Sequence, residues 1–417
     1  MQLNLYAVRV AAVAAALSPG LILTYQGGTG YCYFLALAAA LAWLSDAANR
    51  REAAATLAEY KWYLAAMSAY PLVIVLQQAI SSNFIGPALD APSRLLFVAP
   101  IFALLAAVPA KDLRPVQWGC VAGAFGAAAW SVVSMVAPDD WVISGRAGNP
   151  FTNPIPFGGT ALALGFMGVI PLGDGTRRPR WEWMLRLAGL LAGCYASYAS
   201  GSRGSWIAAP VMLWLFAGRF SRVHRPTPVW RIASVLLVAL CLSGLANTTV
   251  VQERFHAAVS DFHRMAVGDE NNSIGLRLQL WRASWELFQE HPVLGVGKGR
   301  LKDSLEEMAG QGRASQEIIH PHAHNEIFST LAQMGLVGLA ALLLLYVGSA
   351  CYFWSNRHSR DPDTANAATM GLVLVFGTII YGLTIDVFSL VMNTAFYALT
   401  TATLLGIIAN RRRQGAA

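Results

Sequence analysis

Long apolar runs alternate with short polar loops along most of the chain. A helix needs about 20 apolar residues to cross the hydrocarbon core of a membrane, and it satisfies its own backbone groups there. Twelve stretches fit this pattern, at approximately 6–25, 31–46, 62–80, 95–110, 117–137, 156–173, 183–200, 206–218, 231–248, 326–350, 367–385 and 388–409. The pattern predicts an all-α, polytopic membrane protein in which these stretches are transmembrane helices.

The polar segment 249–325 interrupts this alternation and is too long for a simple turn. Apolar side chains recur in it at helical spacing, at Leu276, Leu280, Ala283 and Leu287. This spacing predicts a helix from Ser273 to His291, ended by Pro292, and one more short amphipathic turn at 303–308. We therefore divide the chain into residues 1–248 with nine spans, a large loop at 249–325 with amphipathic helices, and residues 326–417 with three spans and a basic tail.

Charge sharpens the membrane prediction and excludes a nucleic-acid partner. Charged residues make up 13% of the sequence, about half the fraction of soluble domains. The net charge of +7 comes from basic residues in alternate loops, among them Arg50, Arg51, Lys61, Lys111, Arg114, Arg177, Arg178, Arg180, Arg219, Arg222, Arg225, Arg357, Arg360 and Arg411 to Arg413. Because such loops face the cytoplasm, we expect both termini to be cytoplasmic and segment 249–325 to face the periplasm of a bacterium.

Three histidines at alternate positions, His320, His322 and His324, lead into the apolar run that begins at 326. Histidine is the side chain best suited to exchange protons near neutral pH, so one of them is a candidate for proton transfer or hydroxyl binding. Alternate residues of an extended segment point the same way, which leaves a metal site as an alternative, although no carboxylate or cysteine group elsewhere completes it. Structural hydrogen bonding is a third possibility.

Single arginines lie in segments predicted to face outward. Because arginine is disfavoured in such segments near the membrane, a specific role is expected for each of them. Arg203 lies between small residues that let a ligand approach the backbone, Arg277 lies early in the predicted periplasmic helix, and Arg146 lies in a Gly- and Asn-containing loop. Guanidinium groups bind phosphate oxygens in pairs, so two or three that converge would clamp a diphosphate. Unrelated contacts with lipid headgroups are the alternative. Asp139-Asp140 could hold a divalent metal, but a solvated loop is the interpretation we favour.

Four elements, taken together and in order, resemble the O-antigen ligase family within the ligase and polymerase superfamily of bacterial polysaccharide assembly. The resemblance covers roughly residues 140–345. It rests on His324-Asn325, nine residues and then Gly335-Leu-Val-Gly338; on Ser202-Arg-Gly204; on Gly275-Leu-Arg277 followed by Trp281, Pro292 and Gly295-Val-Gly297; and on Gly145-Arg-Ala-Gly148 with Asn153-Pro154.

The resemblance implies a GT-C-type glycosyltransferase in the inner membrane of a Gram-negative bacterium, with its active site facing the periplasm. Such an enzyme takes O-antigen from undecaprenyl diphosphate and ligates it to a sugar of the lipid A–core, completing lipopolysaccharide. The family is metal-independent and inverting, so no metal and no cofactor are expected. An O-antigen polymerase and a protein oligosaccharyltransferase of the same superfamily are alternatives. A transporter of a lipid-linked anion is a more distant one.

By the family's motifs, the resemblance also assigns roles. His324 would activate or orient the acceptor hydroxyl, while Arg203 and Arg277 would bind the diphosphate and stabilise the leaving group. Further substrate-binding residues are expected to be Arg146, Ser202, His322 and Asn325. His322 is an additional histidine that the family's signature does not require.

Overall fold

The computed structural model describes residues 2–138, 142, 145–173, 178–224, 252, 256, 259, 260 and 272–415. Within these ranges the protein is all-helical and has no strand, as the apolar pattern predicts. The ninth predicted span, 231–248, lies outside the described residues, and so does the Asp139-Asp140 pair.

The first part of the described chain forms eleven helices, numbered α1 to α11. Their bounds are α1 Gln2–Leu21, α2 Gly28–Trp43, α3 Ala47–Glu59, α4 Lys61–Ser81, α5 Gly86–Leu96, α6 Val98–Ala107, α7 Ala110–Leu113, α8 Val116–Val136, α9 Pro154–Gly168, α10 Arg180–Ala199 and α11 Arg203–His224. The second part contains α14 Ser273–Glu290, α15 Leu301–Gly310, η2 Gln316–Ile318, α16 Glu326–Asn356, α17 Pro362–Gly382, η3 Val387–Ser389 and α18 Val391–Arg413.

Each of the other eleven predicted spans overlaps a helix. Among the described residues, the segments long and apolar enough to cross a membrane number seven: Asn4–Leu21, Lys61–Ser81, Gly86–Ala107, Ala110–Val136, Glu326–Asn356, Pro362–Gly382 and Val391–Arg413. The helices α2 and α3, bent by 118°, make an eighth if they form one broken span. The protein is thus a multi-pass membrane protein with seven or eight candidate spans, and a total of twelve stays a prediction.

Two further predicted spans, 156–173 and 183–200, are not among these candidate membrane spans, each for a physical reason. Helix α9 has only 15 residues and is buried among its neighbours. Helix α10 carries charges that it satisfies inside the protein, because the fully buried Arg186 donates to Glu182 (2.9 Å) and to Gln117 (2.7 Å). Helix α3 was expected to be part of a basic loop; it has no apolar stripe, and it begins where Asp46 accepts a hydrogen bond from the amide of Ala48 (2.8 Å).

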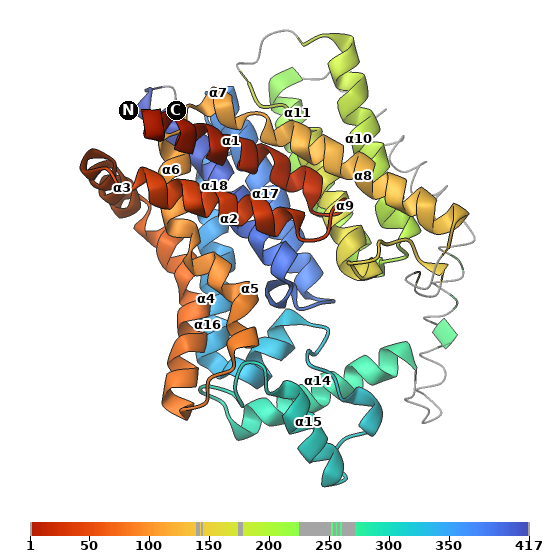
Figure 1. The fold of residues 1–417 in the computed structure, drawn as a ribbon. Coiled ribbons are helices and arrows are strands. Elements are labelled where there is room, and N and C mark those ends of the chain that lie inside the picture. The colour runs from red at the N-terminus through yellow and green to blue at the C-terminus, as the bar shows by residue number, and fades with distance from the viewer. Residues whose placement is uncertain are drawn as a thin grey trace.

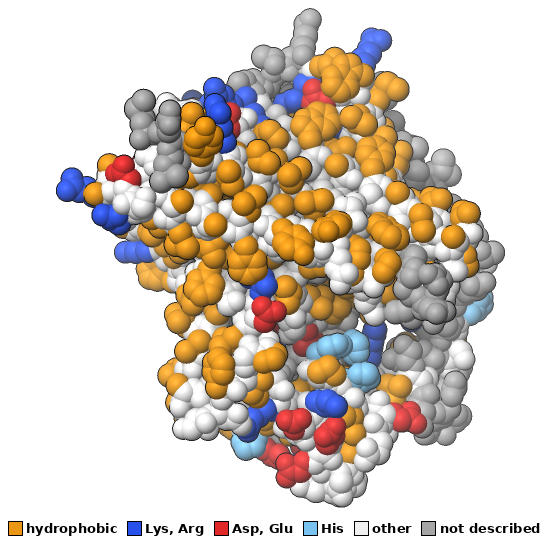
Figure 2. Space-filling view, in the orientation of Figure 1, with side chains coloured by type: hydrophobic (Ala, Val, Ile, Leu, Met, Phe, Trp, Pro, Cys, Tyr) orange, Lys and Arg blue, Asp and Glu red, His pale blue; other side chains and the backbone are white. Residues whose placement is uncertain are grey.

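The two ends of the chain lie together at one end of the bundle, and α14 and α15 lie at the opposite end (Figure 1). Helices α17 and α18 are the most completely buried of the candidate spans, and apolar side chains form a broad band over the visible surface of the bundle (Figure 2). The two termini therefore lie at the end of the bundle opposite to α14 and α15 (Figure 1). The side of the membrane that each end faces stays a prediction.

Helix α14 matches the predicted periplasmic helix closely. Asn272 caps it, since its side chain accepts hydrogen bonds from the amides of Ile274 and Gly275. The predicted stripe faces inward: Leu280, Ala283 and Leu287 form a small core with α15. The assignment of residues 249–325 to one unit is not tested, because most of 249–271 lies outside the described residues.

The segment that follows α14 docks into a kink in the long helix α16. At Gly335 the backbone leaves the helical conformation (φ 61°, ψ −156°), which frees backbone groups that a helix would otherwise pair. The segment 292–297 takes them up in four backbone hydrogen bonds, among them Leu336 to Pro292 (2.8 Å) and Val296 to Ala332 (2.9 Å). The part of the chain that carries α14 and α15, called the polar cap below, is thereby fixed to the membrane bundle.

Two glycines make this close approach possible. A Cβ atom on Gly335 would lie 2.4 Å from the carbonyl carbon of Val293, and one on Gly295 would lie 2.3 Å from that of Gln333. Both residues also have positive φ angles, of 61° and 67°, which side chains disfavour. The Gly-x-x-Gly element of the signature thus begins with a glycine that the docked backbone requires.

We predict that Gly335→Ala and Gly295→Ala each destabilise the protein by about 1–3 kcal/mol, because the new methyl group overpacks the dock and strains the backbone. Thermal unfolding in detergent, followed by intrinsic fluorescence, measures the effect. The matched control is Gly310→Ala in α15, where an added Cβ meets nothing within 4 Å. An unfolding temperature of Gly335→Ala equal to that of the wild type would contradict this account.

Candidate functional site

Two motifs that are distant in the sequence meet at residues 383–390, which join α17 to α18 and are called the 383–390 connection below. Asn325 donates a hydrogen bond from Nδ2 to the carbonyl of Leu383 (3.3 Å). Gly204 packs so closely on the next residue that a Cβ there would lie 2.5 Å from Cγ2 of Thr384. The His-Asn element and the Ser-Arg-Gly element are therefore neighbours in space.

The three histidines form a compact cluster at the start of α16. Ring centroids lie 4.4 Å apart for His322 and His324, 5.6 Å for His320 and His324, and 6.4 Å for His320 and His322. His324 has a left-handed backbone (φ 51°), an uncommon conformation that histidine tolerates better than most residues. Asn325 then caps α16 by accepting hydrogen bonds from the amides of Ile327 and Phe328.

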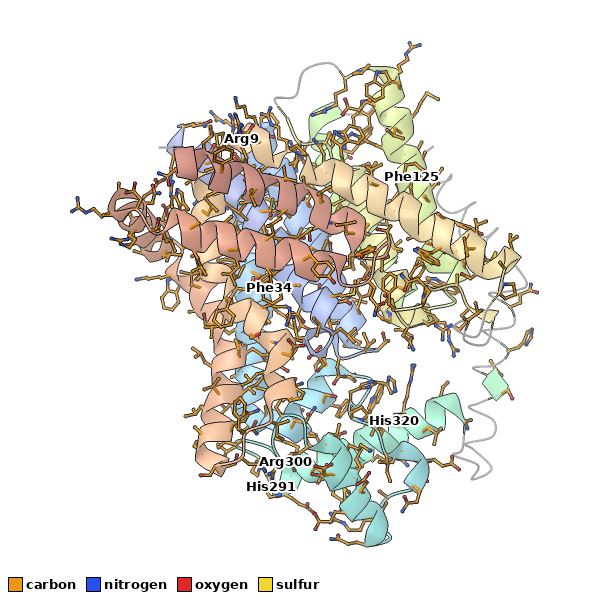
Figure 3. All side chains as sticks on the ribbon, viewed as in Figure 1. Arg9, Phe34, Phe125, His291, Arg300 and His320 are labelled. Carbon is orange, nitrogen blue, oxygen red and sulfur yellow. The ribbon has the colours of Figure 1, made fainter. Side chains whose placement is uncertain are left out.

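Helix α14 braces this histidine segment. The indole of Trp281 donates to the carbonyl of Ala323 (3.0 Å), and its ring stacks on Phe328 with centroids 5.3 Å apart. Figure 3 places His320 between α14 and the helix bundle, and Arg9 at the opposite end of the molecule. The Trp281 of the predicted signature is therefore a support for the histidine loop.

His324 sits in an environment that disfavours its charged form. Burial, and then the charges of His322, Arg277 and His320, lower the pKa of His324 to about 3. The imidazole is therefore neutral at any pH between about 5 and 8. The Nδ1 atoms of His322 and His324 are buried and have no hydrogen-bond partner among the described residues, so both rings can still bond to a ligand.

Arg277 and Arg203 belong to the same electrostatic environment. Burial, and then the charge of Arg203, lower the pKa of Arg277, whose own charge acts on His324. Arg203 is exposed and is the first residue of α11, where the helix dipole favours anions. A partly desolvated pair of like charges at a helix N-terminus is stabilised when an anion binds between them.

The other predicted substrate-binding residues have structural contacts. Arg146 donates from Nε to the carbonyl of Ser200 (2.8 Å), which ties its loop to the turn before Arg203. The Ser202 hydroxyl is buried and accepts a hydrogen bond from Ser205 Oγ (2.9 Å). The amide of Asn325 is used by the cap of α16 and by Leu383. These contacts position the loops that carry Arg203 and His324.

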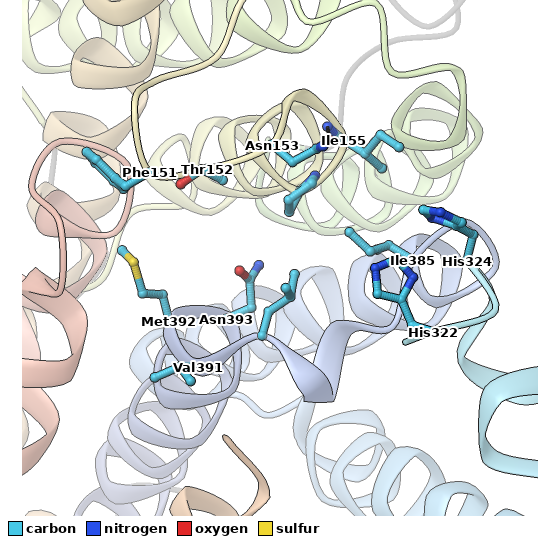
Figure 4. A pocket seen from close by; sticks show the side chains of 12 residues that line it. Phe151, Thr152, Asn153, Ile155, His322, His324, Ile385, Val391, Met392 and Asn393 are labelled. Carbon is cyan, nitrogen blue, oxygen red and sulfur yellow. Dashed lines mark hydrogen bonds between the residues drawn. The ribbon is translucent and has the colours of Figure 1, made fainter. Parts of the chain in front are cut away.

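A pocket of about 310 Å³ opens beside the histidines. Figure 4 shows His322 and His324 on one side of it and Asn153, from the start of α9, on the other. The complete lining consists of Phe151, Thr152, Asn153, Ile155, Pro156, His322, His324, Ile385, Leu390, Val391, Met392 and Asn393. In Figure 2 the histidines gather at the rim of a hollow in the surface, with basic side chains close by.

The sequence analysis missed one wall of this pocket, the stretch from Ile385 to Asn393. No motif marks it, and its residue types are those of an ordinary span end. Its one available signal was position, since it connects two apolar runs on the side predicted to face the periplasm. In the part of the chain that the structure describes, no group of three or more His, Cys, Asp or Glu residues is arranged to hold a metal ion.

Comparison with known proteins agrees with this geometry. Residues 188–343 match the O-antigen ligase family. The resemblance predicted from the motifs is confirmed over this stretch, which contains Arg203, Arg277 and His324. An uncharacterized protein of Haemophilus influenzae is 22% identical over 297 residues, which are 70% of this chain and 73% of that protein. An O-antigen ligase of Escherichia coli is 24% identical over 181 residues, 42% of this chain and 41% of that protein.

We predict that His324 makes the protein less stable in mild acid. Its pKa of about 3 in the folded protein lies below the value of about 6.5 in the unfolded chain. Between these two pH values the folded protein binds fewer protons than the unfolded chain. The free energy of unfolding therefore decreases as the pH falls. The unfolding temperature should therefore fall less from pH 7.5 to 5.0 in His324→Asn than in the wild type. His291→Gln, an exposed histidine at the end of α14, is the control. Equal falls in His324→Asn and the wild type would contradict the assignment.

Proposed function

We propose that this protein is a GT-C-type glycosyltransferase of the Gram-negative inner membrane that ligates O-antigen from undecaprenyl diphosphate onto a sugar of the lipid A–core. One observation carries the proposal: a neutral histidine lines a pocket and lies in the field of Arg277, which itself lies in the field of Arg203. The arginines suit the lipid-linked donor, and the histidine pocket suits the acceptor sugar. The match to the O-antigen ligase family over residues 188–343 supports the same reaction class.

The arginines suit the donor. A diphosphate bound between Arg203 and Arg277 would offset the repulsion of two like charges, one of them partly buried. Guanidinium groups pair with phosphate oxygens at any relevant pH. As the bond from the anomeric carbon to the diphosphate breaks, negative charge grows on the leaving group, and groups already aimed at that charge lower the barrier. Undecaprenyl diphosphate then departs as the anion.

The pocket and its histidines suit the acceptor. The neutral imidazole of His324 takes the proton of the acceptor hydroxyl as the oxygen forms its bond to the anomeric carbon. Attack on the face opposite to the departing diphosphate inverts the configuration. His322 and Asn153 offer further hydrogen-bonding groups for sugar hydroxyls in the same pocket.

The two halves are also coupled by charge. In the free protein the charge of Arg277 helps to hold the pKa of His324 down. A bound diphosphate neutralises that charge, which raises the basicity of the imidazole. The donor thus prepares the base that activates the acceptor, and the imidazole becomes an effective base only when a donor is in place.

The apolar band on the bundle fits a protein that receives both substrates from the membrane lipids around it (Figure 2). The direction of the site follows from the basic loops: we infer that the end carrying α14 and α15 faces the periplasm and the end carrying both termini faces the cytoplasm.

We predict that His324→Asn, Arg203→Ala and Arg277→Ala each lower transfer by about 100-fold or more and leave the protein folded. Asparagine tolerates the left-handed backbone at position 324, so this variant removes the imidazole with little strain. The assay uses purified protein with undecaprenyl-diphosphate-linked O-antigen and lipid A–core. Arg300→Ala is the arginine control, since Arg300 lies on the polar cap near His291 and away from His320 (Figure 3). Transfer at the wild-type rate by all three variants would refute the proposal.

A second arm of the same assay separates the alternatives by acceptor. A ligase forms product with lipid A–core. A polymerase forms product with a second lipid-linked glycan, and an oligosaccharyltransferase does so with a protein acceptor. A transporter of the lipid-linked anion forms no glycosidic bond with any of them. Addition of a chelator tests the expected independence from metal ions.

A further inference from the structure

A buried lysine links the docked segment to the 383–390 connection. Lys298 is only 5% exposed, and its ammonium donates hydrogen bonds to Ser389 Oγ (3.1 Å) and to Tyr70 Oη (3.4 Å). Its backbone amide donates to Gln77 Oε1 (2.9 Å), so α4 fixes its place. An ammonium removed from water in this way needs countercharges.

Two buried carboxylates supply them. Glu326 and Asp386 are each 1% exposed. Burial lowers the pKa of Lys298, but Tyr70, Glu326 and Asp386 together outweigh burial and raise that pKa above its usual value. The lysine therefore stays charged, and the three groups form one buried electrostatic cluster.

This cluster joins the two segments that line the pocket beside the histidines. Glu326 lies two residues after His324 and accepts a hydrogen bond at Oε2 from the backbone amide of Phe388 (3.1 Å). Ser389, bonded to Lys298, is the next residue of the same connection. Ile385 and Leu390 of that connection line the pocket together with His324. The cluster thus lies between the histidine segment and the neighbouring pocket wall formed by the 383–390 connection.

The two carboxyl groups of the cluster have few hydrogen-bond partners. Oε1 of Glu326 and both carboxylate oxygens of Asp386 are buried without a hydrogen-bond partner among the described residues. The two carboxylates are also close enough for their charges to interact. Without the ammonium, the two buried carboxyl groups would have no countercharge beside them.

We propose that Lys298 is a positioning residue for the transfer reaction: by bonding to Ser389, beside the buried Glu326 and Asp386, it holds the 383–390 connection against the histidine segment, so that the imidazole of His324 meets the acceptor hydroxyl. This inference rests on the proposed function. It extends that function to a residue in no predicted motif. Lys298 does not touch substrate, so its loss affects the alignment of the reacting groups and not the binding of the donor.

The test measures kcat and KM for the lipid-linked donor in the wild type and in four variants. Lys298→Met should lower kcat by about 100-fold, as expected for a small misalignment, with KM changed by about twofold or less. Asp386→Asn should lower kcat by less than Lys298→Met does, because Lys298 still bonds to Ser389. Lys298→Met/Asp386→Asn should regain about tenfold over Lys298→Met, since one charge of each sign is gone. Lys302→Met, an exposed lysine of α15 paired with Glu306, is the control and should equal the wild type.

Four results would overturn the proposal. The first is a kcat of Lys298→Met within about threefold of the wild type. The second is a parallel loss of kcat and donor affinity. The third is a failure of the double variant to exceed Lys298→Met, which would indicate that the lysine only stabilises the fold. If Lys298→Met does not fold, the double variant is compared with Asp386→Asn. Equal kcat values for these two variants are the fourth result that would overturn the proposal. A wild-type protein that transfers no glycan refutes the proposed function itself, whereas an active wild type with an active Lys298→Met refutes only this inference.

Discussion

Three side chains from two parts of the chain hold the 383–390 connection between α17 and α18. Asn325 binds the carbonyl of Leu383, Glu326 binds the amide of Phe388, and Lys298 binds the hydroxyl of Ser389. Non-helical backbone next to a membrane bundle is tolerated where protein groups satisfy it. The connection is therefore stable only together with the segments that bind it, and those segments carry the predicted catalytic histidine.

The same constraint fixes the arginine half of the site. Helix α14, which carries Arg277, is followed by the segment that docks at Gly335 of α16. Gly204, next to Arg203, packs against Thr384 of the connection. Because these contacts are made by backbone and glycines, they leave little freedom for the distance between the arginines and His324. Burial is the main cause of the low pKa of His324, and the nearby charges of His322 and Arg277 lower that pKa further.

Local features of the fold could be predicted from the sequence, and long-range ones could not. The helix from Ser273 and its buried stripe follow from spacing and residue type, and the structure confirms them. The 383–390 connection escaped prediction because its partners lie about 60 to 180 residues away in the chain and no motif marks it. Asn325 and Ser202 were expected to bind substrate, which stays a prediction; the structure shows that their side chains also bond to backbone and to a neighbouring hydroxyl. Sequence motifs of this kind identify residues that matter without separating those that touch substrate from those that position them.

The central claim is that the diphosphate of the donor lies between Arg203 and Arg277, next to the pocket lined by His324. An electron cryomicroscopy structure of the protein in lipid nanodiscs with undecaprenyl diphosphate tests it most directly. The account predicts density for both phosphates within hydrogen-bonding distance of the two guanidinium groups, with the first isoprene units leading into the membrane and the histidine pocket left open for the sugars. Diphosphate density at another site, with Arg203 and Arg277 bound only to protein, would contradict it.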